Sequence, residues 1–309
     1  MEKRNFKDFF IISLKGMAMG AADVVPGVSG GTIAFISGIY EELLGSISSI
    51  NTSLFKKLKV EGFNAVWKTI NGNFLLSLIT GIFLSVFTLA KLIGGLLETQ
   101  PILVWSFFFG LVLASIIYVG KQIDSWNIKT VIVLLIGAFI AYYITTLKPI
   151  ISDEVSLSYV FMSGALAICA MILPGISGAF ILVILGAYKS ILDAIEERDL
   201  KVLLTFAVGA IVGILSFSKV LKWLFGHFRN LTLAALTGFI LGSLNKIWPW
   251  KHAVTFRLNS HGEEVPFNEV SVLPWNYEGD AQLLFAIALA VIGFGLILLL
   301  ESLANRKSD

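Results

Sequence analysis

Two copies of the sequence Pro-Gly-x-Ser-Gly are the features of this chain best suited to binding chemistry. They are Pro26-Gly27-Val28-Ser29-Gly30 and Pro174-Gly175-Ile176-Ser177-Gly178. Proline removes a backbone donor and glycine adds conformational freedom, so neither sequence suits the middle of a straight helix. A helix starting after each break would have Ser29 and Ser177 at its N-cap and its first N–H groups unpaired. Such N–H groups favour an anion.

We therefore predict that the two breaks face each other and form an anion-binding site near the midplane of a membrane. The residues expected to line it are Ser29, Gly30, Gly31, Thr32, Ser177 and Gly178. Small residues there would let a ligand approach the backbone. The alternative stays open that the breaks only kink two helices and let them pack closely.

Four further residues carry chemistry that suits such a site. Lys91 and Lys219 lie inside apolar segments, where a charge costs about 2.5–3.5 kcal/mol on insertion scales. They are candidate substrate ligands, and snorkelling to lipid headgroups is the alternative. Tyr40 and Tyr188 are candidate portal residues, with anchoring at the membrane interface as the simpler interpretation.

Asp23 is a carboxylate three residues before the first break. The corresponding residue, three positions before the second break, is Met171. It is a candidate for coupling to a proton or sodium, and pairing with Lys15 or another lysine is the alternative. We predict no catalytic residue, metal site or cofactor. The chain has a single cysteine, its three histidines lack metal-ligand spacing, and no ATP-binding motif is present.

The composition indicates which elements must position these residues. Of the 309 residues, 56% are hydrophobic and 14% charged, and the mean hydropathy is +0.85, whereas soluble domains carry about 25% charged residues. We predict an all-α polytopic membrane protein. A net charge of +2 gives no footprint for nucleic acid. The expected spanning helices are 73–97, 102–120, 130–147, 202–225, 231–247 and 281–300.

An internal repeat relates the two halves of the chain. Residues 26–44 match residues 174–192 at 9 of 19 positions, at an offset of 148. At an offset of 128, Gly81 and Lys91 align with Gly209 and Lys219. We expect repeat 1 over residues 1–150 and repeat 2 over 151–309, each a re-entrant hairpin (9–50 and 159–192) followed by three spanning helices.

Three crossings per repeat would insert the second repeat upside down, which is the inverted-repeat arrangement of secondary transporters. With both termini in the cytoplasm, 13 Lys and Arg fall in inner loops and 7 in outer loops, as the positive-inside rule requires. Four crossings per half, giving parallel repeats, is the alternative. Loop 248–280 is expected outside, with a short hairpin around residues 259–262, as a cap at the headgroups or as a gate.

The segments Lys15–Tyr40 and Leu173–Tyr188 resemble the two signatures of the bacterial polyprenyl-phosphate (undecaprenyl-phosphate) transporter family. The resemblance implies a lipid flippase of the cytoplasmic (inner) membrane that returns undecaprenyl phosphate from the outer to the cytoplasmic leaflet. This carrier lipid is reused for peptidoglycan and other cell-wall polymers. The resemblance also implies a site at the paired re-entrant hairpins.

Two other classes of function stay open. A secondary transporter for a small soluble anion would use the same anion site but seal it from lipid. A lipid-modifying enzyme or a scaffold is the third hypothesis, and an enzyme is disfavoured because no clustered His, Asp and Arg set is present. The expected partners are the polyprenyl phosphate lipid and the bilayer, and a homo-oligomer is left open.

Overall fold

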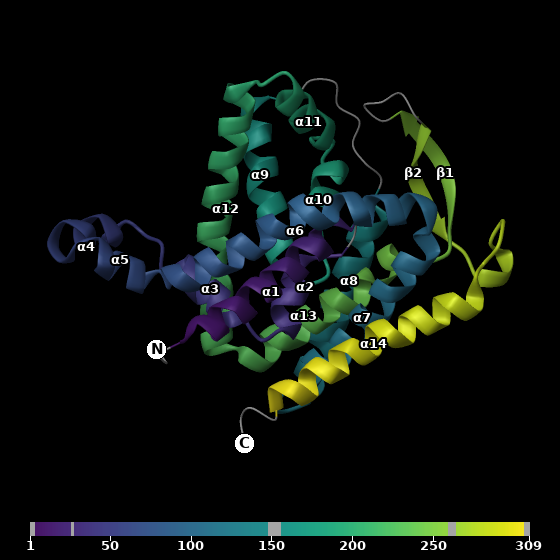
Figure 1. The fold of residues 1–309 in the computed structure, drawn as a ribbon, viewed down its shortest axis with the longest axis horizontal. Coiled ribbons are helices and arrows are strands. Elements are labelled where there is room, and N and C mark those ends of the chain that lie inside the picture. The colour runs from purple at the N-terminus through teal and green to yellow at the C-terminus, as the bar shows by residue number, and fades with distance from the viewer. Residues whose placement is uncertain (1–3, 26–27, 148–155, 259–263, 306–309) are drawn as a thin grey trace.

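The first half of the chain forms eight helices in the computed structural model, which describes residues 4–25, 28–147, 156–258 and 264–305. A long helix is followed by a break, two short helices, two surface helices and three long helices (Figure 1). Their bounds are α1 Phe6–Val24, α2 Gly30–Ile36, α3 Tyr40–Ser48, α4 Ser53–Glu61, α5 Phe63–Thr69, α6 Gly72–Thr99, α7 Pro101–Lys121 and α8 Ile128–Thr146.

The second half repeats this order without the two surface helices, and it adds a two-stranded hairpin before the last helix. Its elements are α9 Leu157–Ile172, α10 Gly178–Ile184, α11 Tyr188–Glu196, α12 Leu200–His227, α13 Arg229–Ser243, the 3-10 helix η1 Leu244–Ile247, β1 Lys251–Leu258, β2 Glu264–Ser271, the 3-10 helix η2 Pro274–Asn276 and α14 Leu283–Asn305.

Local sequence explains where α1 begins and ends. Asn5 and Asp8 form a capping box, in which the Asn5 side chain accepts from the Asp8 N–H at 3.1 Å and the Asp8 carboxylate accepts from the Asn5 N–H at 2.9 Å. The helix stops at Val24, and Val25 is extended, as expected for the residue before a proline. Pro26 and Gly27 themselves lie outside the described residues.

The predicted multi-pass membrane protein is confirmed, with corrections to individual helices. Among the described residues, α6, α7, α8 and α12 are long and apolar enough to span a bilayer, and α10 with α11, bent by 106°, forms one broken pair. The predicted helix 231–247 is wrong in its last turn, because α13 ends at Ser243 and continues as a 3-10 helix. The short helices α4 and α5 were not predicted.

Glycines let the helices pack backbone to backbone. In the pair α1 and α6, a Cβ added to Gly16 would collide with Leu78 O, and one added to Gly20 would lie 2.7 Å from Ile82 O. Both contact positions advance by four residues, so α1 and α6 run parallel. The helices lie side by side in Figure 1.

The pair α9 and α12 repeats this packing. An added Cβ at Gly209 would collide with Phe161 O, and one at Gly213 would lie 2.6 Å from Ala165 O. This pair is therefore parallel as well. Residues Gly209 and Phe161 correspond to Gly81 and Ser13 at the sequence offsets of 128 and 148, and Gly81 indeed abuts Ser13 O.

The last two helices of each half pack across the halves, α8 on α13 and α7 on α14. Gly137 would place an added Cβ 2.7 Å from Ala235 O, and Gly238 abuts Leu134 O. In the other pair, Gly293 abuts Phe107 O. Neither half therefore packs as an independent unit.

The predicted hairpin in loop 248–280 is present as antiparallel strands β1 and β2. Its base is held by tryptophans, because Trp248 Nε1 donates to Val272 O at 2.8 Å and Trp250 Nε1 donates to Ala281 O at 2.9 Å. Trp250 is buried against Ile102 and Ala286, at the start of α7 and of α14. The hairpin is thus anchored to helices of both halves.

Candidate functional site

The first break is closed by the chain's own polar groups. Ser29 is the N-cap of α2, as predicted, and its Oγ accepts from the Gly31 N–H at 3.2 Å. Asp23 Oδ1 accepts from the Gly30 N–H at 2.7 Å. Asp23 therefore occupies the first backbone donor that was predicted to meet an anionic ligand. A bound anion would have to displace this carboxylate.

The two breaks contact each other, although 142 or more residues separate them in the sequence. Ser29 Oγ lies 3.3 Å from both Met171 O and Leu173 O, so one hydroxyl proton is shared between two carbonyls of the second break. Thr32 Oγ1 accepts from the Gly175 N–H at 2.9 Å. Ser29 and Thr32 are each 1% exposed. The breaks thus form one buried polar junction.

Small residues are required at this junction. An added Cβ at Gly31 would lie 2.6 Å from Ile172 O, and one at Gly178 would lie 2.6 Å from Ala167 O. Gly175 has a φ of +87°, which favours glycine over any residue with a Cβ. The glycines were predicted to let a ligand approach the backbone. In the structure, backbone carbonyls of the chain itself approach Gly31 and Gly178.

The second break differs from the first in its capping. Ser177 stands at the N-cap position of α10, but its side chain makes no capping hydrogen bond. The predicted N-cap position of Ser177 is thus confirmed without a capping hydrogen bond, and the residue is 9% exposed. Met171 stands in this half at the position that corresponds to Asp23. Among the described residues, no hydrogen bond from the start of α10 to a carboxylate matches that of Gly30 to Asp23.

The two candidate lysines lie on exposed faces of long helices. Lys219 on α12 lines a cavity of about 380 Å³ between α3 and α12, together with Ser48, Lys222, Trp223, Gly226 and His227. Lys91 is exposed on α6. The structure thus assigns Lys219 to a cavity that Ser29 and Ser177 do not line.

Tyr40 is part of the core, not an interface anchor. It is 3% exposed, and its ring packs against Phe35 and Phe225 with centroid distances of 4.9 and 5.9 Å. It also lines a cavity of about 440 Å³ with Phe35, Gly38, Glu41, Tyr118, Lys121 and Gln122. Tyr188 is half-buried and packs against the small apolar cluster of Ala167, Leu182 and Ala187.

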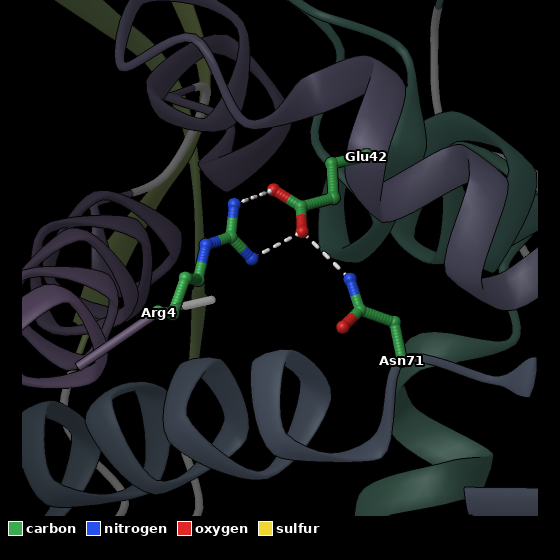
Figure 2. A network of polar contacts seen from close by, with 3 residues as sticks. All are labelled: Arg4, Glu42 and Asn71. Carbon is green, nitrogen blue, oxygen red and sulfur yellow. Dashed lines mark hydrogen bonds and ion pairs between the residues drawn. The ribbon is translucent and has the colours of Figure 1, made fainter. Parts of the chain in front are cut away.

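Sequence reasoning missed two arginines that pair with the first turn of α3. Arg4 forms a bidentate pair with Glu42 at 2.5 and 2.8 Å, and Asn71 Nδ2 donates to the same carboxylate at 2.6 Å (Figure 2). Arg229 pairs with Glu41 at 2.6 Å. The partners are 38 and 188 residues apart, so no local pattern could have indicated them. The first turn of α3 is thereby tied to α1, α6 and α13.

Comparison with known proteins found one family model and two curated relatives for this chain. A model of the undecaprenyl phosphate translocase-like family matches residues 19–265, a range that includes both breaks. The curated polyprenyl-phosphate transporter of Vibrio cholerae is 50% identical over 297 residues, 95% of this chain and 96% of that protein. That of Staphylococcus aureus is 33% identical over 254 residues, 76% of this chain and 85% of that protein. No solved structure matches the chain significantly.

Proposed function

Because this chain belongs to the undecaprenyl phosphate translocase-like family, we propose that it moves undecaprenyl phosphate from the outer to the cytoplasmic leaflet of a bacterial inner membrane. The lipid would be returned for reuse in peptidoglycan and other envelope polymers. A phosphate monoester carries about −1.5 to −2 charges, so its headgroup does not cross hydrocarbon unaided. The protein is needed to shelter this headgroup, while the polyprenyl tail stays in lipid.

The observation that carries this proposal is the contact between the two helix breaks. Ser29 of one break and the carbonyls of Met171 and Leu173 of the other meet at a buried junction. Hydrogen-bonding backbone at membrane depth is tolerated only where protein or a cavity satisfies it. A junction of two breaks is where movement of one half against the other would open and close such a cavity.

In the proposed bound state, the phosphate lies between the breaks. Its ligands are Ser29, Gly30, Gly31 and Thr32 from the first break and Ser177 and Gly178 from the second. Lys91 and Lys219 draw the headgroup in from opposite leaflets. Tyr40 and Tyr188 form the portals toward these sites.

Asp23 is the proposed point of proton coupling. Its carboxylate accepts from the Gly30 N–H, a donor that the phosphate needs. Protonation neutralises Asp23, weakens this hydrogen bond and releases Gly30 to the substrate. Headgroup release would then return Asp23 to Gly30 with loss of the proton. Sodium is the alternative coupling ion.

The proposed topology is a pair of inverted repeats with both termini in the cytoplasm. Helix α1 runs parallel to α6, and α9 runs parallel to α12, so the chain must return to its starting side between the members of each pair. This favours re-entrant hairpins and disfavours four crossings per half. In Figure 1 the start of α1 and the end of α14 lie toward the lower left, whereas β1 and β2 lie at the upper right.

The test is translocation by the full chain reconstituted in liposomes that contain undecaprenyl phosphate, scored by the fraction of phosphate reachable from outside. We expect wild type to equilibrate the leaflets faster at pH 6 than at pH 8. Asp23→Asn should lose this pH dependence, because asparagine can still accept from Gly30 but does not titrate. Ser29→Ala should slow translocation more than Ser177→Ala, since Ser29 joins the two breaks.

Asp124→Asn, on an exposed loop, is the matched control and should behave as wild type. Equal leaflet exposure with wild-type protein and with empty liposomes would overturn the proposed function. Release of entrapped inorganic phosphate without lipid movement would instead indicate a transporter of small soluble anions. Unchanged pH dependence in Asp23→Asn would remove Asp23 from coupling.

A further inference from the structure

The cavity at the turn between α2 and α3 has features that the junction of the breaks does not use. Its volume is about 440 Å³, and its wall combines Tyr40, Tyr118, Lys121 and Gln122 with the backbone of Gly38. A Cβ added to Gly38 would meet no atom within 4 Å, so this turn borders open space. The cavity is large enough to hold a phosphate group and part of an isoprenoid unit.

The hydroxyl of Tyr40 is buried and has no hydrogen-bond partner among the described residues. Buried polar groups are nearly always paired, and an unpaired one destabilises the folded state. Phenylalanine at this position would fill the same space without that cost. Tyr40 as a residue lines the cavity, so an acceptor that enters there would be the missing partner of this hydroxyl.

The charges around the cavity suit an anion. Glu41 lies on the wall, but Arg229 pairs with it at 2.6 Å. Glu42 is held by Arg4 (Figure 2). Lys121 is the basic residue among those that line this cavity.

The start of helix α3 adds backbone donors. This helix of nine residues begins at Tyr40, and its N-cap Ile39 has no side chain that caps it. Gly38, Tyr40 and Glu41 line the cavity, so the positive end of α3 borders the same space as the Tyr40 ring. The first N–H groups of a helix and its dipole both favour an anion.

We propose that this cavity is a second binding site for the phosphate monoester headgroup, lined by Tyr40, Lys121 and the N-terminus of α3 and distinct from the junction of the breaks. The role of this site rests on the proposed function: the headgroup would occupy it on the cytoplasmic side of the junction. Helix α2 links the two, since it begins after Ser29 and Phe35 near its end lines the cavity. At 1.5 Å per residue, its seven residues separate the sites by about 10 Å.

The test is calorimetric titration of the full chain in detergent with inorganic phosphate, with a short-chain prenyl phosphate and with the matching prenol. We expect both phosphates to bind, the prenyl phosphate more tightly, and the prenol not to bind. Tyr40→Phe and Lys121→Gln should each weaken phosphate binding about tenfold, as expected for the loss of a hydrogen bond to a charged group. Tyr143→Phe and Lys129→Gln, on exposed positions of α8, are the matched controls and should bind as wild type.

A melting temperature separates binding from folding. Tyr40→Phe should unfold at the same or a higher temperature than wild type without ligand, because it removes an unpaired buried hydroxyl. Weaker phosphate binding together with an unchanged or raised melting temperature supports the site. Wild-type phosphate affinity in both Tyr40→Phe and Lys121→Gln overturns it, as does a lowered melting temperature that accounts for the weaker binding.

The same variants distinguish this inference from the proposed function. If wild type translocates undecaprenyl phosphate but the variants bind phosphate normally, the second site is wrong and the proposed function stands. If wild type fails to translocate the lipid while Tyr40→Phe still loses phosphate binding, the cavity is an anion site and the proposed function is wrong. Binding of inorganic phosphate with exclusion of the prenyl phosphate would assign the cavity to the free anion and overturn its role for the lipid.

Discussion

Ser29 and Ser177 occupy the same place in two matching sequences, but their side chains make different hydrogen bonds in the structure. Ser29 caps α2 and reaches the carbonyls of the second break, with Asp23 bound beside it at Gly30. Ser177 makes no capping hydrogen bond. A second difference is Asp23, whose carboxylate accepts from Gly30, whereas Met171 stands at the corresponding position of the second half. The two breaks are therefore similar in sequence and unequal in chemistry.

Lys251, which lies outside the membrane-spanning helices, shows how burial alters the pKa of a single side chain. Its side chain is 8% exposed and lies 3.6 Å from Glu269, with Nζ 4.1 Å from the centre of the Trp105 ring. Burial lowers the pKa of Lys251 to about 8, although Glu269 partly opposes this shift. Because the unfolded chain holds this proton up to about pH 10.4, raising the pH above 8 removes a charge from the folded protein alone.

We therefore expect the free energy of unfolding to rise by about 1 kcal/mol between pH 7 and pH 9 through Lys251. The sign is positive because the unfolded state binds more protons than the folded state in this range. Chemical unfolding in detergent at both pH values measures it. In Lys251→Met this contribution should vanish, and an equal pH dependence in wild type and variant would contradict the assignment.

At the scale of elements, glycine makes the close helix crossings in both halves of the chain. Gly81 abuts Ser13 O, and Gly209 abuts Phe161 O, so α1 on α6 and α9 on α12 use corresponding positions. The sequence predicted that Gly81 and Gly209 align, but it did not identify their neighbours. A backbone carbonyl in contact leaves no side chain that can move aside for a larger residue.

Gly81→Ala should lower the free energy of unfolding by about 1–3 kcal/mol, since the added methyl forces two backbones apart. Gly95→Ala on the same helix is the control, because an added Cβ there meets no atom within 4 Å. It should be neutral or stabilising by up to about 1 kcal/mol, from helix propensity. Thermal unfolding of the purified variants compares them, and a wild-type melting temperature for Gly81→Ala would contradict the packing.

At the scale of the whole molecule, the two halves are interlocked. Helix α8 of the first half packs on α13 of the second, and α7 packs on α14. The two pairs use corresponding contacts. Gly137 of α8 lies against Ala235 O of α13, and Gly293 of α14 lies against Phe107 O of α7. A movement of one half must therefore slide or rotate along these crossings, which join parts of both halves.

Cysteine labelling tests the proposed topology. The chain has one cysteine, so Cys169→Ser provides a background for single cysteines at Ser53, Ser125, Glu197 and Glu278. We expect a membrane-impermeant maleimide to label the last two positions in intact spheroplasts, and Ser53 and Ser125 only after permeabilisation. Labelling of Ser53 and Glu197 from the same side would contradict the inverted repeats.

The sequence by itself determined the membrane class, the two breaks, most helix positions and the family. Each of these depends on local composition or on short motifs, which a single chain displays directly. The tertiary structure decided which groups meet: Asp23 with Gly30, Ser29 with the second break, Arg229 with Glu41. It also showed that Tyr40 is buried at a cavity. Such contacts join residues up to 188 positions apart, and the packing of helices from both halves against one another brings them together.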